Sequence, residues 1–276
     1  GSVDDGKSTL IGRILYEAQS LFDDQVASLK SDSKKHGTQG ADIDFALLVD
    51  GLAAEREQGI TIDVAYRFFT TDRRRFIVAD TPGHHQYTRN MATGASTASL
   101  AIILVDARQG VLEQTRRHSY ICHLMGIRQI ILAVNKMDLM DYDAEVFDQI
   151  VTEYEAFAKP LQFADVTAIP ISALKGDYIN SRSKAMPWYK GPTLISKLET
   201  VPNRLEAETG GFAMPDQLVN RPNSHFRGYS GIVLRQPVSS GEAVRISPSG
   251  VSTSVKNIWL AGTKLEKAAP GLSVTL

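Results

Sequence analysis

The sequence predicts an α/β domain with a mostly parallel sheet, followed by a smaller, truncated β-barrel domain. Between residues 6 and 158, short apolar runs alternate with amphipathic stretches, as in a chain of β-α-β units. After residue 202 the pattern changes to short alternating runs broken by Gly, Pro and Ser, which is typical of all-β structure. We therefore expect the first domain at 1–203, a linker at 204–211 and the partial barrel at 212–276.

The predicted strands of the first domain are short and rich in Ile and Val, and most of them run into Asp or Asn. Strands of a parallel sheet look like this because helices cover both faces of the sheet. Ligands of such sheets bind beyond the carboxyl ends of the strands, where these polar residues stand. The predicted strands are 75–80, 100–107, 129–138 and 166–174.

Amphipathic stretches between and after these strands predict the helices of the first domain. The last of them is closed by Pro202, which cannot continue a helix. The predicted helices are 86–96, 113–125, 145–157 and 191–202.

Composition excludes several functional classes. Hydrophobic residues make up 43% and charged residues 22% of the 276, as in ordinary globular proteins. The longest apolar stretch, around residues 100–105, is far shorter than the ~20 residues that cross a bilayer. With 30 basic and 31 acidic residues, no general basic field for nucleic acid is expected. The single Cys122 suits a reducing, cytoplasmic compartment.

The sequence opens on the spacing G-x-x-x-x-G-K-S, which is that of a phosphate-binding loop. Backbone N–H groups of such a loop surround phosphate oxygens, and the following helix adds the positive end of its dipole. The lysine reaches the β- and γ-phosphates, while the serine hydroxyl ligates Mg²⁺. No strand precedes the loop, so we expect a domain that lacks its first strand. The predicted contacts are Gly1, Ser2, Val3, Asp4, Asp5, Gly6, Lys7, Ser8 and Thr9.

Two further segments predict contacts to Mg²⁺ and the γ-phosphate. The first follows a strand, so that its leading carboxylate can hold a water on Mg²⁺ and its glycine N–H can meet the γ-phosphate. It comprises Asp80, Thr81, Pro82, Gly83 and His84. The second is 59–63, in which Thr61 supplies a hydroxyl and a carbonyl. Ser8, Thr61 and Asp80, the last through water, are therefore the predicted Mg²⁺ site.

Two segments predict recognition of a guanine base. A carboxylate at Asp138 can accept both the N1–H and the N2–H₂ of guanine, whereas adenine offers no such pair of donors. The second segment would close over the base with backbone groups. The predicted residues are Asn135, Lys136, Met137 and Asp138 in the first segment and Ser172, Ala173 and Leu174 in the second. Together with the phosphate contacts, they predict a GTP-hydrolysing P-loop domain.

Segments 59–63 and 80–84, with a β domain behind, resemble the translation elongation factor superfamily. Segments 2–25, 33–69, 80–96 and 220–231 are more narrowly similar to the GTPase subunits of bacterial sulfate adenylyltransferase, and the similarity extends over essentially the whole chain. This resemblance implies a smaller partner subunit that joins ATP and sulfate into adenylyl sulfate and pyrophosphate, while this chain hydrolyses GTP to drive that step.

The resemblance also implies that His84 orients the attacking water. Two positions depart from the family pattern, because His85 and Ser99 stand where acidic residues are expected. Neither position is a nucleotide ligand, so we expect small effects. The competing function is a translation factor that delivers aminoacyl-tRNA, and the shared architecture allows it.

Three other readings carry less weight. A zinc site at His118, Cys122 and His123 lacks a fourth ligand at a plausible spacing, so helix packing is favoured. A cis arginine finger at Arg56 is less favoured than a surface role for that residue. Phe68 and Phe69 are expected to pack within a strand rather than to stack on bases.

Overall fold

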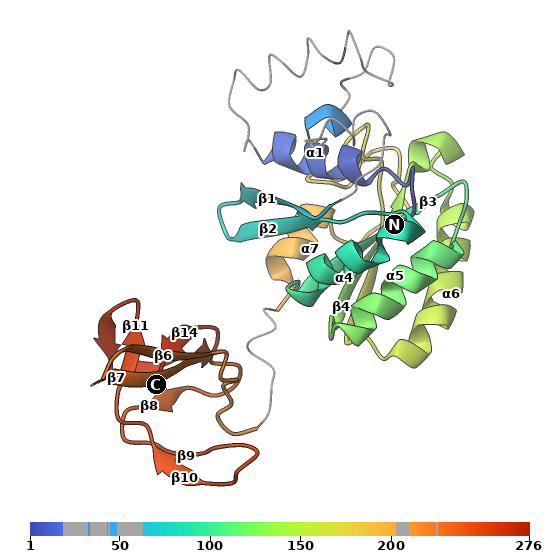
Figure 1. Cartoon of the computed structure of the whole chain (residues 1–276). Helices are drawn as coiled ribbons and strands as arrows, with labels where there is room; N and C mark the ends of the chain where they lie inside the picture. The colour runs from blue at the N-terminus through green and yellow to red at the C-terminus, as the bar shows by residue number, and fades with distance from the viewer. Residues whose placement is uncertain (19–32, 34–42, 44, 49–62, 203–209, 225) are drawn as a thin grey trace. The chain divides into compact units, whose positions relative to one another are not determined.

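The computed structural model describes residues 1–18, 33, 43, 45–48, 63–202, 210–224 and 226–276. These residues form two compact units, Gly1–Val201 and Pro202–Leu276 (Figure 1). The predicted linker at 204–211 lies largely outside the described residues, as does Thr61.

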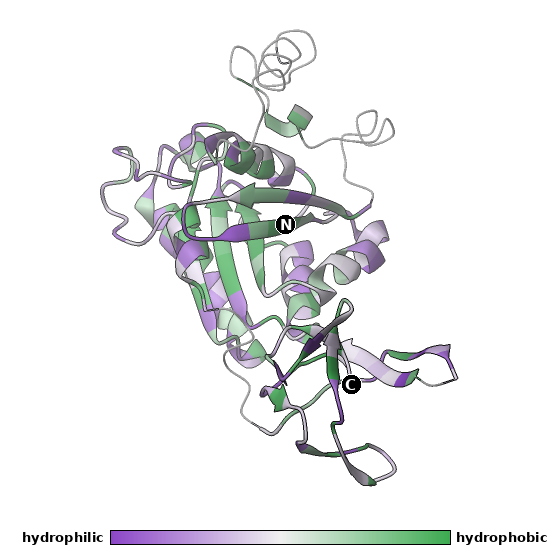
Figure 2. Ribbon diagram, turned by 90° about the vertical axis from the view of Figure 1, so that its left-hand side faces the viewer, coloured by the Kyte–Doolittle hydropathy of each residue, from purple (hydrophilic) through white to green (hydrophobic). Residues whose placement is uncertain are grey.

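A parallel sheet forms the centre of the first unit. Its strands β3 (Leu100–Asp106), β4 (Gln129–Asn135) and β5 (Asp165–Pro170) pair in the order β3-β4-β5. The residues of β4 between Ile130 and Val134 are fully buried, since this strand has a neighbour on each side and helices against it. The strands accordingly carry the strongest hydrophobic colour of this unit in Figure 2. The predicted α/β fold with a parallel sheet is confirmed.

Helices cover this sheet close to the predicted positions. α5 (Glu113–Leu124) contacts β3, and α6 (Ala144–Ala158) contacts β4 and β5. α6 begins where the Asp143 carboxylate accepts a hydrogen bond from the Glu145 N–H at 2.8 Å. The remaining helical elements of the unit are α1 (Lys7–Glu17), α4 (Thr88–Ser96), α7 (Leu194–Thr200), η1 (Phe45–Leu48), η2 (His85–Tyr87), η3 (Met137–Met140) and η4 (Lys159–Leu161).

Two predicted helices differ from the observed ones at their starts. The helix expected at 86–96 is divided into η2 and α4, because His84 caps a short 3₁₀ turn before the α-helix begins. The helix expected from 191 begins only at Leu194. There the Thr193 hydroxyl accepts a hydrogen bond from the Ser196 N–H at 3.3 Å and so caps α7.

Strands β1 (Ala65–Thr70) and β2 (Arg75–Asp80) form an antiparallel hairpin with a sheet of its own. Phe69 is buried and stacks on Phe76 with ring centroids 4.6 Å apart, as expected for strand packing. Phe68 and Ile77, paired on the opposite face, are 65% and 69% exposed. The expectation of a fully buried strand at 75–80 is therefore wrong, because alternate side chains of this hairpin point away from the core.

The second unit is antiparallel throughout its described strands. Its largest sheet has the order β12-β11-β14-β7-β6, with two further strand pairs, β9–β10 and β8–β13. Buried Val, Ile and Ala side chains fill its own small core. This arrangement is consistent with the predicted barrel type. The strands are β6 (Leu218–Asn223), β7 (Phe226–Ile232), β8 (Val238–Ser239), β9 (Ala243–Arg245), β10 (Ser252–Ser254), β11 (Ile258–Leu260), β12 (Thr263–Leu265), β13 (Lys267–Ala268) and β14 (Ser273–Thr275).

None of the helices among the described residues is both long enough and apolar enough to cross a membrane.

Candidate functional site

The predicted phosphate-binding loop curls around the side chain of Lys7. The Lys7 ammonium donates to the carbonyl oxygens of Gly1 at 3.3 Å and Ser2 at 2.6 Å. The Asp5 carboxylate accepts a hydrogen bond from the Ser2 N–H and closes the turn. Gly6 has φ +90°, a conformation that favours glycine, and α1 starts at the next residue. The loop therefore leads directly into a helix N-terminus. The other predicted contacts are Val3 and Asp4 in the loop and Ser8 and Thr9 in the first turn of α1.

The segment after β2 lies against this loop. A Cβ atom at Gly83 would collide with the Lys7 ammonium and approach the Gly1 carbonyl oxygen to 2.9 Å, so only glycine fits there. Asp80, at the end of β2, is 3% exposed. Burial lowers the pKa of Lys7, while the charges of Asp5 and Asp80 raise it. The predicted γ-phosphate segment and the phosphate loop are thus brought together.

His84 stands at the exit of this segment, following Thr81, Pro82 and Gly83. Its Nδ1 accepts a hydrogen bond from the Gln86 N–H at 3.3 Å, which caps η2. The side chain is half-buried, and its ring centroid lies 4.3 Å from that of the exposed His85. The cap occupies one ring nitrogen, so Nε2 is the nitrogen available to another partner.

Asn135 connects three of the predicted segments. It ends β4 and is buried, and its Nδ2 donates to the Asp5 carbonyl of the phosphate loop at 2.8 Å. Its Oδ1 accepts from the Ala173 N–H at 2.9 Å. Segments 130 positions apart in the chain are therefore held together by one amide side chain.

The residues after Asn135 turn into η3. Lys136 has φ +64°, and the buried Met137 donates its N–H to the Ile171 carbonyl at 3.2 Å. These contacts place Asp138 in the first turn of η3, where its side chain is half-buried. Within the part of the chain that the structure describes, no hydrogen bond to the Asp138 carboxylate is found.

The segment at 172–174 is anchored from both sides. The buried Ser172 hydroxyl accepts from the Lys175 N–H at 3.1 Å. From α1, Arg13 donates to the carbonyl oxygens of Leu174 at 3.1 Å and Lys175 at 3.3 Å. Sequence reasoning missed Arg13 because it lies in no nucleotide motif, and its position on α1 carries no local signal of this contact.

The remaining predictions concern Thr61, Arg56 and the zinc alternative on the helix that contains His118 and Cys122. Thr61 and Arg56 lie outside the described residues, so their expected contacts stay predictions. His118 and Cys122 are buried on α5, and the His118 Nε2 lies 2.9 Å from the Gln114 Nε2. Burial is the main cause that lowers the pKa of His118, to about 3.

The model of the elongation factor Tu GTP-binding domain family matches residues 1–219. The chain belongs to this family. Sulfate adenylyltransferase subunit 1 of Methylorubrum populi is 59% identical over the whole chain, which spans 59% of that relative. The bifunctional enzyme NodQ of Rhizobium sp. is 60% identical, again over the whole chain, which spans 43% of that protein. The chain thus spans between two fifths and three fifths of the length of these relatives.

Among solved structures, this elongation factor Tu family member is similar to the Ski7 GTPase-like domain of S. cerevisiae bound to GDP and inorganic phosphate. The TM-score is 0.60 at 18% identity, and the match covers the whole chain and 68% of the Ski7 chain. At this identity the likeness shows the fold alone. The resemblance inferred from the motif segments agrees with the names of the curated relatives.

In this family member, Asn135→Ala is expected to destabilise the fold as well as the site. The change leaves the Asp5 carbonyl and the Ala173 N–H buried without their partner, so we expect a loss of about 2 kcal/mol in the free energy of unfolding. Chemical denaturation measures it. The matched control is Thr152→Ala, which removes one exposed hydrogen bond on α6 and should cost less than ~0.5 kcal/mol. Equal losses in both variants would contradict the bridging role of Asn135.

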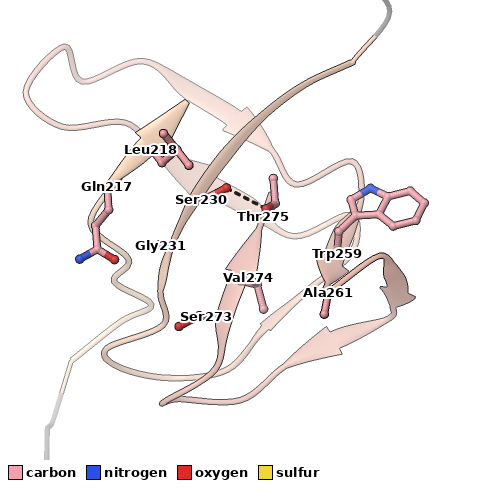
Figure 3. A pocket seen from close by; sticks show the side chains of 9 residues that line it. All are labelled: Gln217, Leu218, Ser230, Gly231, Trp259, Ala261, Ser273, Val274 and Thr275. Atoms are coloured by element: carbon pink, nitrogen blue, oxygen red, sulfur yellow. Dashed lines mark hydrogen bonds between the residues drawn. The ribbon is translucent and has the colours of Figure 1, made fainter. Parts of the chain in front are cut away.

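A pocket of about 240 Å³ lies in the second unit, and none of the predicted site residues is among those that line it. Strands β6, β7, β11 and β14 line it, and the Ser230 and Thr275 hydroxyls hydrogen-bond to each other at 2.8 Å across it (Figure 3). Trp259 stands at one end of the lining. No charged side chain lines this pocket, and nothing in it matches the nucleotide chemistry described above.

Proposed function

We propose that this chain is the GTP-hydrolysing part of a sulfate adenylyltransferase, in which it couples GTP hydrolysis to the formation of adenylyl sulfate and pyrophosphate from ATP and sulfate. The observation that carries the proposal is the identity of 57–60% over the whole chain with relatives, most of which are named subunit 1 of this enzyme. We also propose a GTP-binding domain at 1–203, a linker at 204–211, a partial barrel at 212–276 and a cytoplasmic location.

The phosphates of GTP would bind where the loop surrounds Lys7. In the structure the Gly1 and Ser2 carbonyl oxygens accept hydrogen bonds from the Lys7 ammonium, so the loop is already curved around this charged group. The Lys7 ammonium would turn to the β- and γ-phosphates, and the N–H groups of residues 1–9 would donate to their oxygens.

The residues around Lys7 also fit Mg²⁺. Ser8 and Asp80 supply oxygen donors, which hard cations prefer, and the charge of the buried Asp80 already acts on the neighbouring Lys7. We propose that Ser8 and Thr61 ligate the ion directly and that Asp80 holds one of its waters. When bound, Mg²⁺ would neutralise charge on the β- and γ-phosphates.

The guanine base would lie between the segments 135–138 and 172–174, which the Asn135 side chain joins to each other. Asp138, whose carboxylate accepts no hydrogen bond from the described residues, would accept from the N1–H and N2–H₂ of guanine, and the backbone of Ser172, Ala173 and Leu174 would close over the ring. Asn135, Lys136 and Met137 complete this side of the site. The contacts from Arg13 and Asn135 hold the closing segment in place before the nucleotide arrives.

We propose that His84 orients the water that attacks the γ-phosphorus. A bond forms between the water oxygen and phosphorus as the bond to the β–γ bridging oxygen breaks, which gives GDP and inorganic phosphate. Because Nδ1 caps η2, Nε2 is the atom that would hold the water. Its capped position at the end of the γ-phosphate segment restricts the ring orientation.

The test of this function is GTP turnover of the full-length protein with its proposed partner, a smaller subunit that joins ATP and sulfate. We expect slow hydrolysis alone and at least tenfold faster hydrolysis when that subunit, ATP and sulfate are all present, because the partner's reaction must bias the GTPase for coupling to occur. Adenylyl sulfate formation is measured in parallel. Omitting sulfate alone is the control.

Stimulation by ribosomes and aminoacyl-tRNA, with indifference to the sulfate-activating partner, would overturn this proposal in favour of a translation factor. No feature of the described residues favours that function specifically. The similarity to translation-factor-like structures is at 18–23% identity and shows the shared fold.

A further inference from the structure

Asp106 is a buried carboxylate next to the proposed nucleotide site. It belongs neither to the phosphate loop at 1–9 nor to the base-side segment at 135–138. Asp106 is the last residue of β3 and stands in register with Asn135, the last residue of β4. Its side chain is fully buried. Charged side chains are rarely buried without partners, because their desolvation is costly. The partners of Asp106 therefore indicate what it is for.

Two cations share this carboxylate. Arg108 donates from Nε to Oδ1 at 3.0 Å and from Nη2 to Oδ2 at 2.6 Å, and its backbone N–H also reaches Oδ1 at 3.0 Å. The Lys136 ammonium lies 2.9 Å from Oδ2. Although burial raises it, the hydrogen bonds from Arg108 and Lys136 hold the pKa of Asp106 down to about 2, so the ion pairs persist at neutral pH.

Lys136 makes a second contact, on the phosphate loop. Its ammonium donates to the carbonyl oxygen of Asp4, a residue with φ +66°. One ammonium group thus bridges the end of β3 and the loop that would hold the phosphates. The backbone of Asp106 is held in register with Asn135 at the end of the central sheet.

We propose that Asp106 is a positioning residue that fixes Lys136 onto the phosphate loop, so that the base-side and phosphate-side segments release a nucleotide only together. Arg108 contacts both oxygens of the carboxylate and is not part of this connection, because its guanidinium makes no hydrogen bond to the phosphate loop among the described residues. The inference rests on the proposed function, and it deepens the account of the same site.

The first experiment measures dissociation of fluorescent GDP from the full-length protein. Asp106→Asn removes the charge and retains the shape of the side chain, so Lys136 loses its anchor. We expect dissociation at least tenfold faster, with the single-turnover rate of saturating GTP unchanged within twofold. The matched control is Arg108→Gln, which should leave GDP dissociation within twofold of the unmodified protein. A tenfold effect of Arg108→Gln, or none of Asp106→Asn, would overturn the proposal.

A double-mutant cycle separates positioning from general structural damage. If Asp106 acts through Lys136, Asp106→Asn should add less than twofold to GDP dissociation in a Lys136→Met background. The same tenfold effect in both backgrounds would show that Asp106 acts by another route.

A further measurement needs neither a bound nucleotide nor a folded Asp106 variant. In the nucleotide-free protein, Lys136→Gln should raise hydrogen exchange of the backbone amides in residues 1–9 at least tenfold, because the loop loses the hydrogen bond from Lys136 that holds its Asp4 carbonyl in place. Unchanged exchange there would overturn the proposed connection. An unmodified protein that binds no GDP would instead disprove the proposed function, and the exchange measurement would still test the connection between Lys136 and the phosphate loop.

Discussion

Asp138→Asn is expected to change the nucleotide preference of this protein from GTP to xanthosine triphosphate. The carboxylate would accept from two donors of guanine, whereas the new amide would donate to the xanthine oxygen at the same place. Because a buried site rejects a ligand that leaves its hydrogen-bonding groups unpaired, we expect the preference between the two nucleotides to change by about 10⁴-fold or more. Isothermal calorimetry with both nucleotides measures it.

Asp141→Asn is the matched control for Asp138→Asn. It makes the same change of charge three residues later, at the end of η3, where φ is +50° and asparagine is tolerated. Its affinities for GTP and xanthosine triphosphate should equal those of the unmodified protein. If Asp138→Asn also left GTP affinity unchanged, Asp138 would not contact the base.

His84→Ala is expected to slow single-turnover GTP hydrolysis by ~10² or more, while GTP affinity stays nearly intact. The reason is that the ring would position water in the transition state and would not contact bound GTP strongly. Rapid-quench measurement of phosphate release at saturating GTP gives the rate, and calorimetry gives the affinity.

Two further variants distinguish water positioning from capping of η2. His84→Asn keeps a side-chain acceptor for the Gln86 N–H but lacks the Nε2 atom, so it should be as slow as His84→Ala. His85→Ala changes the exposed neighbouring ring and should hydrolyse GTP normally. Normal hydrolysis by His84→Ala together with a slow His85→Ala variant would show that the wrong histidine has been assigned.

Much of the fold could be predicted from local patterns. The parallel strands predicted at 100–107 and 129–138, which the structure places at Leu100–Asp106 and Gln129–Asn135, were recognisable because such strands are covered on both faces and are therefore apolar. The exposure of Phe68 and Ile77 could not be predicted, since an apolar residue in a short strand carries no mark of which face will be covered. The observed helix starts also differ from the predicted ones by a few residues, because more than one nearby residue could have served as the N-cap that Thr193 provides for α7.

The sequence by itself was enough to predict the chemistry of the candidate site. The order and spacing of the motif segments predict a phosphate loop, a carboxylate for Mg²⁺ and an acceptor for guanine, because each of these functions needs particular residue types at short range. The same segments identified the family that the whole-chain comparison then showed. Local spacing was sufficient since each motif is contained within nine residues or fewer.

Only the tertiary structure decided how these segments are joined. Asn135 bridges the predicted phosphate loop and Ala173, Arg13 reaches the Leu174 carbonyl, and Lys136 lies between Asp106 and Asp4. These partners are separated by about 30 to 160 positions in the chain. Their contacts depend on strand order and register, which bring the ends of β3 and β4 side by side. No local pattern of side chains encodes that juxtaposition, because it arises from packing of the whole domain.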